Sequence, residues 1–565
     1  MNFPSSSEPR HFFRPNGHHV PVGLCRLPKA RVVWVNQRMI RRDPAFAACG
    51  GTLERYANHL LEACAYAIAK EKERSCAIGI ADRYGGLGIG KNGGSGRAVL
   101  VNDYYVKGVG RTPLIGALTD EAHASGGAYL EECVRETIFS ELAGSEFPGG
   151  AVPTLAIIDT GLVQVWQRKS GPYPERRCLL VRPGFLRPAH FERASGHLSA
   201  DPRDGYSDAQ RVRCAYQTAI ELWGRAGLLA AYKKLWLTWA EQLAYAYVHR
   251  LPHGGDTTSN IAMDGRLLDF GGMTAIPSWA RISLAWNIWR IPDVGDSPLN
   301  ILQAIRTHSE LLGKYVDADL ANHHIIEEVS RVTLRRYQNV LVREILRLVG
   351  LSREQADLLL HKVPGAASVA GRVVSHYRRD HFTLFEGTPI PHIPWDIDQF
   401  WSSAPPYHWR ALREMLQENQ KLLCKSGEGD LKMFAGRVKL RGRDRPKLYR
   451  HEFKRELSHH LENEMEGDLL NQHNLGRLIS TTVCENRRDS SIEPDNAVPV
   501  GFAQNETESY ALFRSTDTDK LFAKRESWRD SEATAAPNKA KSVVAISELA
   551  EKGFILSDAS LALMA

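Results

Sequence analysis

The sequence lacks the features that mark a secreted or membrane-spanning protein. Its nine cysteines are scattered over 565 residues without a Cys-x-x-Cys pair, so we expect neither a zinc site nor a disulfide framework. The N-terminus has no basic start followed by an apolar run, unlike a signal peptide. The most apolar helical stretch, residues 228–248, is interrupted by Lys233 and Glu241. These absences predict a cytoplasmic protein with no membrane span.

A strong charge of either sign is also absent. The net charge is +7, and charged residues make up 24% and hydrophobic residues 43% of the chain, an ordinary globular composition. This balance gives no indication of nucleic-acid binding, although it suits a site that receives a polyanion such as a nucleoside triphosphate. The length exceeds what one hydrophobic core can serve, so we expect about two to four domains.

The first concentrated signal is a glycine-rich stretch, with seven glycines between residues 85 and 96. Such a segment cannot pack a core, but it lets backbone amides approach an anion closely. Residues 98–101 and 104–106 are predicted strands, and the second delivers Lys107. A glycine-rich loop followed by a lysine on the next strand is typical of kinase-like sites that clamp ATP phosphates. An ordinary linker is the alternative.

Residues 129–142 are predicted to form a helix with an apolar stripe, and Glu136 lies on the opposite side of that stripe. Glu136 is therefore either a solvated glutamate or the residue that pairs with and orients Lys107. Strands are predicted at 155–158, 163–166 and 178–181, and Arg182 and Arg187 follow the last of them. These arginines could meet phosphate oxygens, or they could only aid solubility on an exposed loop.

The stretch from residue 253 to 272 carries the most specific signal. Asn260 offers a neutral oxygen ligand and Asp269, before Phe-Gly-Gly, offers a carboxylate. Asp264-Gly265 is a hairpin signal, and a hairpin here would put Asn260 and Asp269 side by side. One amide oxygen and one carboxylate suit a Mg²⁺ ion that also holds nucleotide phosphates. A polar surface hairpin is the alternative.

Helices dominate the rest of the predicted structure. Helical patterns cover 209–226, 229–249, 279–289, much of 300–362, 366–378 and 407–423. The basic cluster at 439–447 is expected to be a solvated loop, with a partner contact as the alternative. Residues 484–545 are polar and aperiodic, so a linker or partly disordered segment is expected, and the last twenty or so residues regain apolar content and could dock back.

Several segments between about residues 80 and 290 form a recognisable set: Tyr84-Gly-Gly, Gly96-Arg97-Ala98, Lys107-Gly-Val-Gly-Arg-Thr-Pro113, Arg135-Glu136, Phe185-Leu-Arg187, His190-Phe-Glu192, His253-Gly, Asn260, Asp269-Phe-Gly271 and Trp286-Asn-Ile-Trp-Arg290. With these segments the chain resembles the SelO (YdiU) family of protein adenylyltransferases, which have a pseudokinase fold. The chain also looks like a diverged member, similar to the MchC type of microcin-maturation proteins.

The resemblance implies an α+β, bilobal protein-kinase-like fold that transfers AMP from ATP, with Mg²⁺, to a protein hydroxyl. The expected regions are an N-terminal extension (1–75), a β-rich N-lobe (76–192), a helical C-lobe (193–425) and a C-terminal extension (426–565). Lys107 would hold phosphates, Glu136 would orient it, and Asn260 and Asp269 would hold the metal. The nucleotide-binding residues implied are Gly85, Gly86, Gly96, Arg97, Lys107, Gly126, Arg182 and Arg187.

The sequence departs from the family at chemically important positions. Ser259 stands where the family has an aspartate before the metal-binding asparagine, and Asp256 is the possible replacement base. Residues 124–127 lack an acid and an arginine that the family carries. Leu180 stands where the family has a second phosphate-binding arginine, and Arg182 is the nearest replacement.

These departures leave four functions open. The first is AMP transfer to a protein hydroxyl. The second is activation of a peptide carboxylate as an acyl-adenylate during siderophore-microcin maturation, with a partner acyltransferase, because a carboxylate acceptor needs no general base. The third is a non-catalytic nucleotide-binding scaffold, and the fourth is an ordinary kinase. All four predict ATP and Mg²⁺ as ligands, and the first two predict a protein or peptide acceptor.

Overall fold

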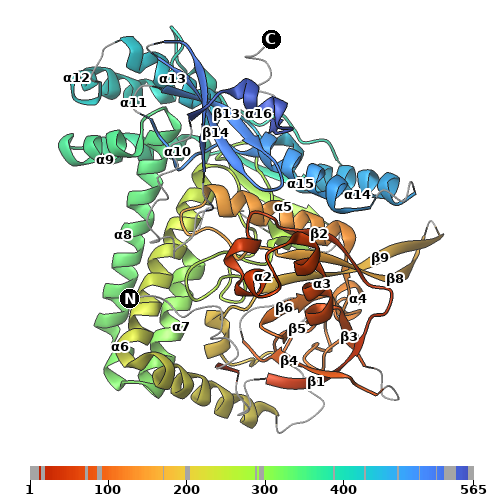
Figure 1. The fold of residues 1–565 in the computed structure, drawn as a ribbon. Coiled ribbons are helices and arrows are strands. Elements are labelled where there is room, and N and C mark those ends of the chain that lie inside the picture. The colour runs from red at the N-terminus through yellow and green to blue at the C-terminus, as the bar shows by residue number, and fades with distance from the viewer. Residues whose placement is uncertain are drawn as a thin grey trace.

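The computed structural model shows a mixed α/β protein in which helices and three β-sheets share the described chain (Figure 1). The structure describes residues 12–13, 19–69, 74–85, 92–169, 171–197, 204–286, 289–291, 298–385, 388–424, 428–466, 470–494, 497–516, 518–526, 528 and 543–557.

The largest sheet comes from the first third of the chain. Its nine strands are β1 (His19–Arg26), β2 (Arg31–Val35), β3 (Tyr66–Ile68), β4 (Ala77–Asp82), β5 (Ala98–Val101), β6 (Tyr104–Lys107), β7 (Ala128–Tyr129), β8 (Ala156–Arg168) and β9 (Gly171–Pro183). Their order is β2-β8-β9-β6-β5-β4-β1-β3, with β7 added beside β9. All these pairs are antiparallel, and the sheet curls into a half-barrel.

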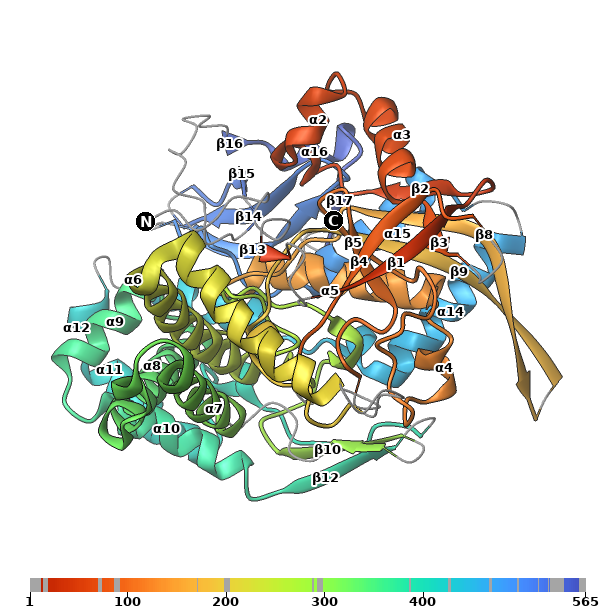
Figure 2. The same cartoon turned by 90° about the horizontal axis from the view of Figure 1, so that it is seen from below.

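The strands that carry the glycine-loop signal form as predicted. Between β5 and β6, Asn102 and Asp103 adopt positive φ angles of 48° and 70°, which suits a tight hairpin turn because these residues tolerate the left-handed region. The two strands predicted at 155–158 and 163–166 are instead one strand, β8, with a register shift after Asp159. The hairpin of β8 and β9 extends away from the body of the molecule (Figure 2).

Helix α5 (Leu130–Glu146) confirms the helix predicted over 129–142. One side of α5 faces the large sheet, and α14 (Arg450–Glu466) and α15 (Gln472–Asn486) pack against it from the C-terminal region (Figure 1). Because it is covered on both sides, its polar residues are buried as well as its apolar ones, and Glu136 and Glu146 are fully buried.

The middle of the chain is helical, as predicted. Its helices are α6 (Asp204–Val248), α7 (Leu299–Tyr315), α8 (His323–Leu348), α9 (Arg353–Lys362), α10 (Ala366–Tyr377), α11 (Tyr407–Glu418), α12 (Gln420–Leu423) and α13 (Glu428–Arg441). The helices predicted at 209–226 and 229–249 are one element, α6, interrupted where Gly224 takes a φ of 69°. Helices α2 (Pro44–Ala48), α3 (Leu53–Cys64) and α4 (Glu121–Ala124) lie in the N-terminal region.

The helix predicted over 279–289 is wrong. Strands β10 (Arg281–Trp286) and β11 (Trp289–Ile291) form there, and residues 287–288 lie outside the described residues. β10 pairs with β11 on one side and in parallel with β12 (His381–Phe385) on the other, so part of its hydrogen bonding comes from a strand far along the chain. Local periodicity cannot reveal such a partner, and tertiary pairing overrides helix propensity here.

The linker predicted over 484–545 is wrong for residues 497–525. Strands β13 (Ala497–Gln504), β14 (Ser509–Ser515) and β15 (Leu521–Arg525) form a sheet with β16 (Val543–Val544) and β17 (Ile555–Leu556). β17 pairs with β13, beside helix α16 (Ile546–Glu551), so the end of the chain docks back as predicted. Residues 529–542, which belong to the predicted linker, lie outside the described residues.

The basic cluster at 439–447 is not a solvated loop throughout. Arg441 is buried and donates to Asp489, and Arg445 is buried and donates to Glu146 on α5. Buried arginines need carboxylate partners because an unpaired charge in the interior is costly. These pairs attach the C-terminal region to α5.

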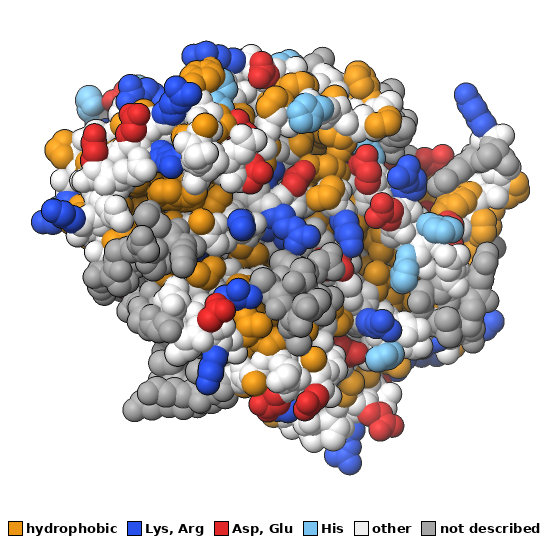
Figure 3. All heavy atoms as spheres, turned by 90° about the horizontal axis from the view of Figure 1, so that it is seen from above, with side chains coloured by type: hydrophobic (Ala, Val, Ile, Leu, Met, Phe, Trp, Pro, Cys, Tyr) orange, Lys and Arg blue, Asp and Glu red, His pale blue; other side chains and the backbone are white. Residues whose placement is uncertain are grey.

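The surface carries charges of both signs. On the face shown in Figure 3, Lys and Arg side chains are interspersed with Asp, Glu and apolar side chains. Among the helices of the described chain, none has an apolar stretch long enough to cross a membrane.

Candidate functional site

A cleft of about 2010 Å³ brings most of the predicted site residues together. Its walls come from the large sheet, α5, the segment around residues 254–272 and α14. The predicted residues that line it are Gly85, Gly96, Arg97, Lys107, Arg182, Arg187, Asn260 and Asp269. The separate signals of the sequence therefore converge on one place.

Lys107 is the centre of this convergence. It ends β6, and its ammonium nitrogen lies 2.5 Å from Glu136 Oε1 and 3.5 Å from Asp269 Oδ1. Its side chain is mostly buried, and burial and Arg97 lower its pKa, but the surrounding carboxylates outweigh them and leave the pKa raised. Lys107 therefore keeps its positive charge and joins α5 to the Asp269 segment.

Glu136 is fully buried, so the alternative of a solvated glutamate is wrong. Its Oε1 accepts from Lys107, and its Oε2 accepts from Arg182. One carboxylate thus fixes two cations that face the cleft. Arg182 lies two residues after Leu180 on β9, and residues two apart on a strand share a face. Arg182 therefore points to the same side of β9 as Leu180, and it supplies the positive charge that a leucine cannot.

Glu132 is a site residue that the sequence reasoning missed. It lies one helical turn before Glu136 on α5, and it accepts from Arg97 at 2.7 and 3.1 Å and from Lys107 at 2.9 Å. Burial acts to raise its pKa, but Arg97 and Lys107 hold the pKa well below its usual range. The signal was available, because residues four apart share a helix face.

The hairpin predicted around Asp264-Gly265 is confirmed. Leu268 N–H donates to Asn260 O at 3.1 Å, and Gly265 supplies the turn with a φ of 90°. The Asn260 side-chain amine donates to Gly255 O at 2.8 Å, which leaves its amide oxygen as the group that can serve as a ligand.

Asp269 takes a left-handed backbone conformation, with φ 60°, at the end of this hairpin. Its side chain is 38% exposed toward the cleft. Burial acts to raise its pKa, but Lys107 and Arg97 are the strongest of the neighbouring cations that hold the pKa far below its usual range. Asn260 lines the same cleft, and an ionised carboxylate together with a neutral amide oxygen fits a hard divalent cation such as Mg²⁺.

Arg187 forms another part of the wall. Its guanidinium donates to Ser259 O and lies 4.9 Å from the centroid of the Tyr84 ring. Burial acts to lower its pKa, but nearby groups, Tyr84 and Asp82 first among them, leave the pKa raised. Arg187 therefore stays charged and is held in place by the residue that precedes Asn260.

Two predicted residues lie outside this arrangement. Asp256 is not among the described residues that line the cleft; its Oδ1 is buried without a hydrogen-bond partner in the described chain, and burial raises its pKa. Gly126 instead packs against the backbone of Gly110, where a φ of 73° and a contact too close for a side chain require glycine. Gly86 lies outside the described residues.

No family model and no curated protein sequence matches this chain. The chemistry of the cleft therefore has to be argued from its own residues.

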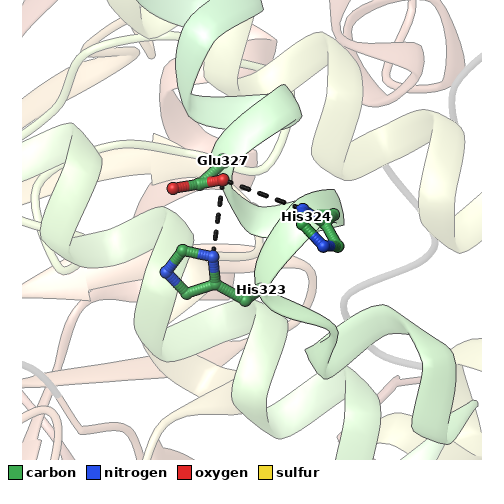
Figure 4. A group of neighbouring side chains, drawn as sticks. All are labelled: His323, His324 and Glu327. Carbon is green, nitrogen blue, oxygen red and sulfur yellow. Dashed lines mark ion pairs between the residues drawn. The ribbon is translucent and has the colours of Figure 1, made fainter.

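A second group of potential metal ligands lies at the start of α8, outside the cleft lining. His323, His324 and Glu327 approach one another on the exposed surface, with the Glu327 carboxylate between the two rings (Figure 4). The glutamate lies 3.4 Å from His323 Nδ1 and 4.0 Å from His324 Nδ1. All three are well exposed, and exposed groups of this kind are common without a metal ion, so the cleft is the better candidate.

Proposed function

We propose that this protein is an ATP- and Mg²⁺-dependent nucleotidyltransferase that transfers AMP to a protein or peptide acceptor. The observation that carries the proposal is the contact of Lys107 with both Glu136 and Asp269 in one cleft. A lysine fixed by a helix glutamate and facing a metal-binding aspartate is the arrangement that kinase-like enzymes use to hold nucleotide phosphates. The contacts of Lys107 therefore support a kinase-like site built on β5, β6 and α5.

The charges around the site support a phosphate-bearing ligand. Lys107, Arg97, Arg182 and Arg187 face the cleft together with the carboxylates of Glu132 and Asp269, and the buried carboxylate of Glu136 holds Lys107 and Arg182 from behind. The cations are fixed before any ligand arrives, and preorganised charges stabilise developing negative charge without reorganisation. Asn260 and Asp269 would hold Mg²⁺, which would neutralise the phosphate oxygens.

The residues of this chain would then act mainly by positioning. Lys107 would hold phosphate oxygens while Glu136 keeps the ammonium in place. Arg187, held by Ser259 O and Tyr84, would contact another phosphate. AMP transfer requires the acceptor oxygen to attack the α-phosphorus, with pyrophosphate leaving, so positioning of the acceptor is the remaining requirement.

Activation of a carboxylate as an acyl-adenylate is the second candidate. The observation that favours it is the absence of a carboxylate base from the position before Asn260. The Ser259 hydroxyl is hydrogen-bonded to Thr257 at 2.8 Å, and Asp256 is not among the described residues that line the cleft. A carboxylate acceptor is already ionised near neutral pH and needs no base, whereas a hydroxyl acceptor does.

Parallel reactions with α-³²P-ATP and γ-³²P-ATP test the proposal. The protein is incubated with Mg²⁺ and candidate acceptors, and label on protein or peptide is measured. We expect label from the α-phosphate alone, with release of pyrophosphate. Label from the γ-phosphate alone would establish a kinase and overturn the proposal. Pyrophosphate release that requires an acceptor carboxyl group would select the acyl-adenylate reaction.

A further inference from the structure

The cleft extends beyond Lys107 and Asp269 into a region that the nucleotide site does not use. We name this region the outer cleft, and its walls are the β8–β9 hairpin and α14, which lie side by side in both views (Figures 1 and 2). Ordinary small-molecule pockets measure about 300 to 1000 Å³, whereas the whole cleft measures about 2010 Å³. A bound nucleotide would therefore leave room for a second reactant.

One wall of the outer cleft is aromatic. Trp166 on β8 and Tyr173 on β9 lie directly opposite each other in the hairpin register. The Trp166 indole N–H donates to Glu175 at 2.8 Å, and Tyr129 contacts the Trp166 ring edge-on, with centroids 5.6 Å apart. These contacts hold the Trp166 ring in place, and Trp166 and Tyr173 are both partly exposed in the cleft. Large rings of this kind are good contact surfaces for a binding partner.

The other wall is α14, and its sequence divides the helix into two faces. Phe453, Leu457 and Leu461 recur every fourth residue and are buried in the core. Lys454 and Arg455 lie off this stripe, with Arg455 on nearly the opposite side of the helix, and both are exposed and line the cleft. Neither makes an ion pair with any described residue, whereas Lys107, Arg97 and Arg182 of the inner site each make one.

The two walls are joined to each other and to the metal site. The Tyr173 hydroxyl donates to Glu462 on α14 at 3.2 Å. At the other end of α14, Arg450 donates to Gly271 O, two residues after Asp269. Arg135 of α5 donates to the same carbonyl oxygen at 3.2 Å. A partner held against α14 would therefore lie next to the reacting end of the nucleotide.

The mixture of charges on α14 discriminates between kinds of partner. Glu452, Glu456 and Glu462 also line the cleft, matching in number the three cations Arg450, Lys454 and Arg455. A continuous polyanion such as a nucleic acid would be repelled by these carboxylates. A polypeptide supplies backbone donors and acceptors and both kinds of charge, so it suits a lining of mixed sign.

We propose that the outer cleft binds the acceptor as an extended polypeptide segment, with an aromatic or apolar side chain on Trp166 and a carboxylate on Lys454 and Arg455. Lys454 and Arg455 favour a carboxylate because it can form the ion pair that no described residue of the protein makes with them. This inference rests on the proposed function, since it names the acceptor of that reaction and the surface that holds it.

The test measures the binding of two ligands separately. The probe is a fluorescein-labelled peptide of alternating Glu and Tyr, followed by fluorescence anisotropy, and Mg-ATP is followed by calorimetry. We expect Lys454→Glu/Arg455→Glu to weaken peptide binding at least about tenfold and to leave Mg-ATP affinity unchanged. Lys107→Ala should do the reverse. Trp166→Ala should also lower the affinity for the peptide without altering the affinity for Mg-ATP.

Matched controls make the result specific. Arg335→Glu/Lys362→Glu reverses two exposed cations on α8 and α9, outside the described cleft lining, and should leave peptide affinity unchanged. A peptide of alternating Lys and Tyr and a single-stranded oligothymidylate should bind more weakly than the Glu-Tyr peptide. Tighter binding of either one, or equal peptide affinity in Lys454→Glu/Arg455→Glu and wild type, would overturn the inference.

The two proposals can fail independently. If the peptide binds through Lys454 and Arg455 but no AMP is transferred to any acceptor, the proposed function is wrong and the polypeptide site stands. If AMP transfer to protein is unchanged by Lys454→Glu/Arg455→Glu and by Trp166→Ala, the proposed function stands and the outer cleft is not its acceptor site.

Discussion

The inner and outer parts of the cleft differ in how their charges are held. Around Lys107 each charged side chain has a partner, and Glu136 alone fixes two cations. In the outer cleft Lys454 and Arg455 have no ion-pair partner in the described chain. Paired, buried charges are preorganised for a small ligand of fixed geometry. Unpaired, exposed cations can instead form ion pairs with negative charges on a binding partner. The comparison teaches that one cleft can prepare two different kinds of binding.

The largest effect should follow from removing the centre of the inner cleft. Lys107→Ala takes away the cation that contacts both Glu136 and Asp269, so we predict that AMP transfer falls by about 10² to 10³-fold. Initial rates with α-³²P-ATP measure it, and Lys233→Ala, an exposed lysine on α6, is the control. A rate within a few-fold of wild type would show that Lys107 does not hold phosphates.

Glu136→Gln should affect stability as well as activity. The change leaves Lys107 and Arg182 without the carboxylate that both contact in a buried site. Removing one partner of a buried ion pair costs about 3 to 5 kcal/mol, so we predict a loss of about 3 kcal/mol in urea unfolding. Glu310→Gln, at an exposed pair on α7, should cost less than about 1 kcal/mol. Equal losses of unfolding free energy in Glu136→Gln and Glu310→Gln would contradict the proposed pairing of Glu136 with Lys107 and Arg182.

Glu132→Gln should change ligand affinity in a direction that distinguishes this residue from Glu136. Glu132 neutralises Arg97 and Lys107, while Glu136 still holds the lysine when Glu132 is changed. We predict that ATP without Mg²⁺ binds about 3- to 10-fold more tightly to the variant, because the site gains net positive charge. Calorimetry in the presence of a chelator measures this affinity. Weaker binding would show that Glu132 positions the cations instead of competing for them.

The smallest effect on activity is expected at Asp256. Because it lies outside the described cleft lining, Asp256→Asn should change AMP transfer by less than about twofold. Burial raises the pKa of Asp256. The folded state therefore holds its proton more tightly than the unfolded state, and stability falls as pH rises above the ordinary aspartate range.

The variant Asp256→Asn removes this pH-dependent loss. Its melting temperature should exceed that of wild type at pH 8, and the difference should shrink as pH approaches about 4. Thermal scans across this range check it. A large loss of AMP transfer in the variant would instead identify Asp256 as the replacement base.

The inner cleft could be predicted because its signals are local. Lys107 follows a glycine-rich loop on a short hairpin, and Asn260 and Asp269 are brought together by a turn only a few residues long. The burial of Glu136 could not be predicted, because it depends on β6 and β9, whose Lys107 and Arg182 cover its carboxylate in the folded chain. Periodicity described one helix face and gave no information about what covers the other.

The outer cleft and two segments of the fold were missed for the same reason. α14 reaches the cleft through tertiary packing, and β10 finds its partner β12 far along the chain. Strands β13 and β14 contain short apolar runs, at 497–503 and 510–513, but only the assembled sheet shows that successive residues pack into two different core clusters. The domain boundaries at 75, 192 and 425 stay predictions.

Calorimetric titration of the protein with ATP in the presence and absence of Mg²⁺ tests the central claim most directly. The account predicts saturable binding of one nucleotide that is tighter with Mg²⁺ than without it, loses this dependence on Mg²⁺ in Asp269→Ala and is retained in Lys454→Glu/Arg455→Glu. No binding by wild type, or binding by Asp269→Ala that is as tight and as dependent on Mg²⁺ as that of wild type, would contradict it.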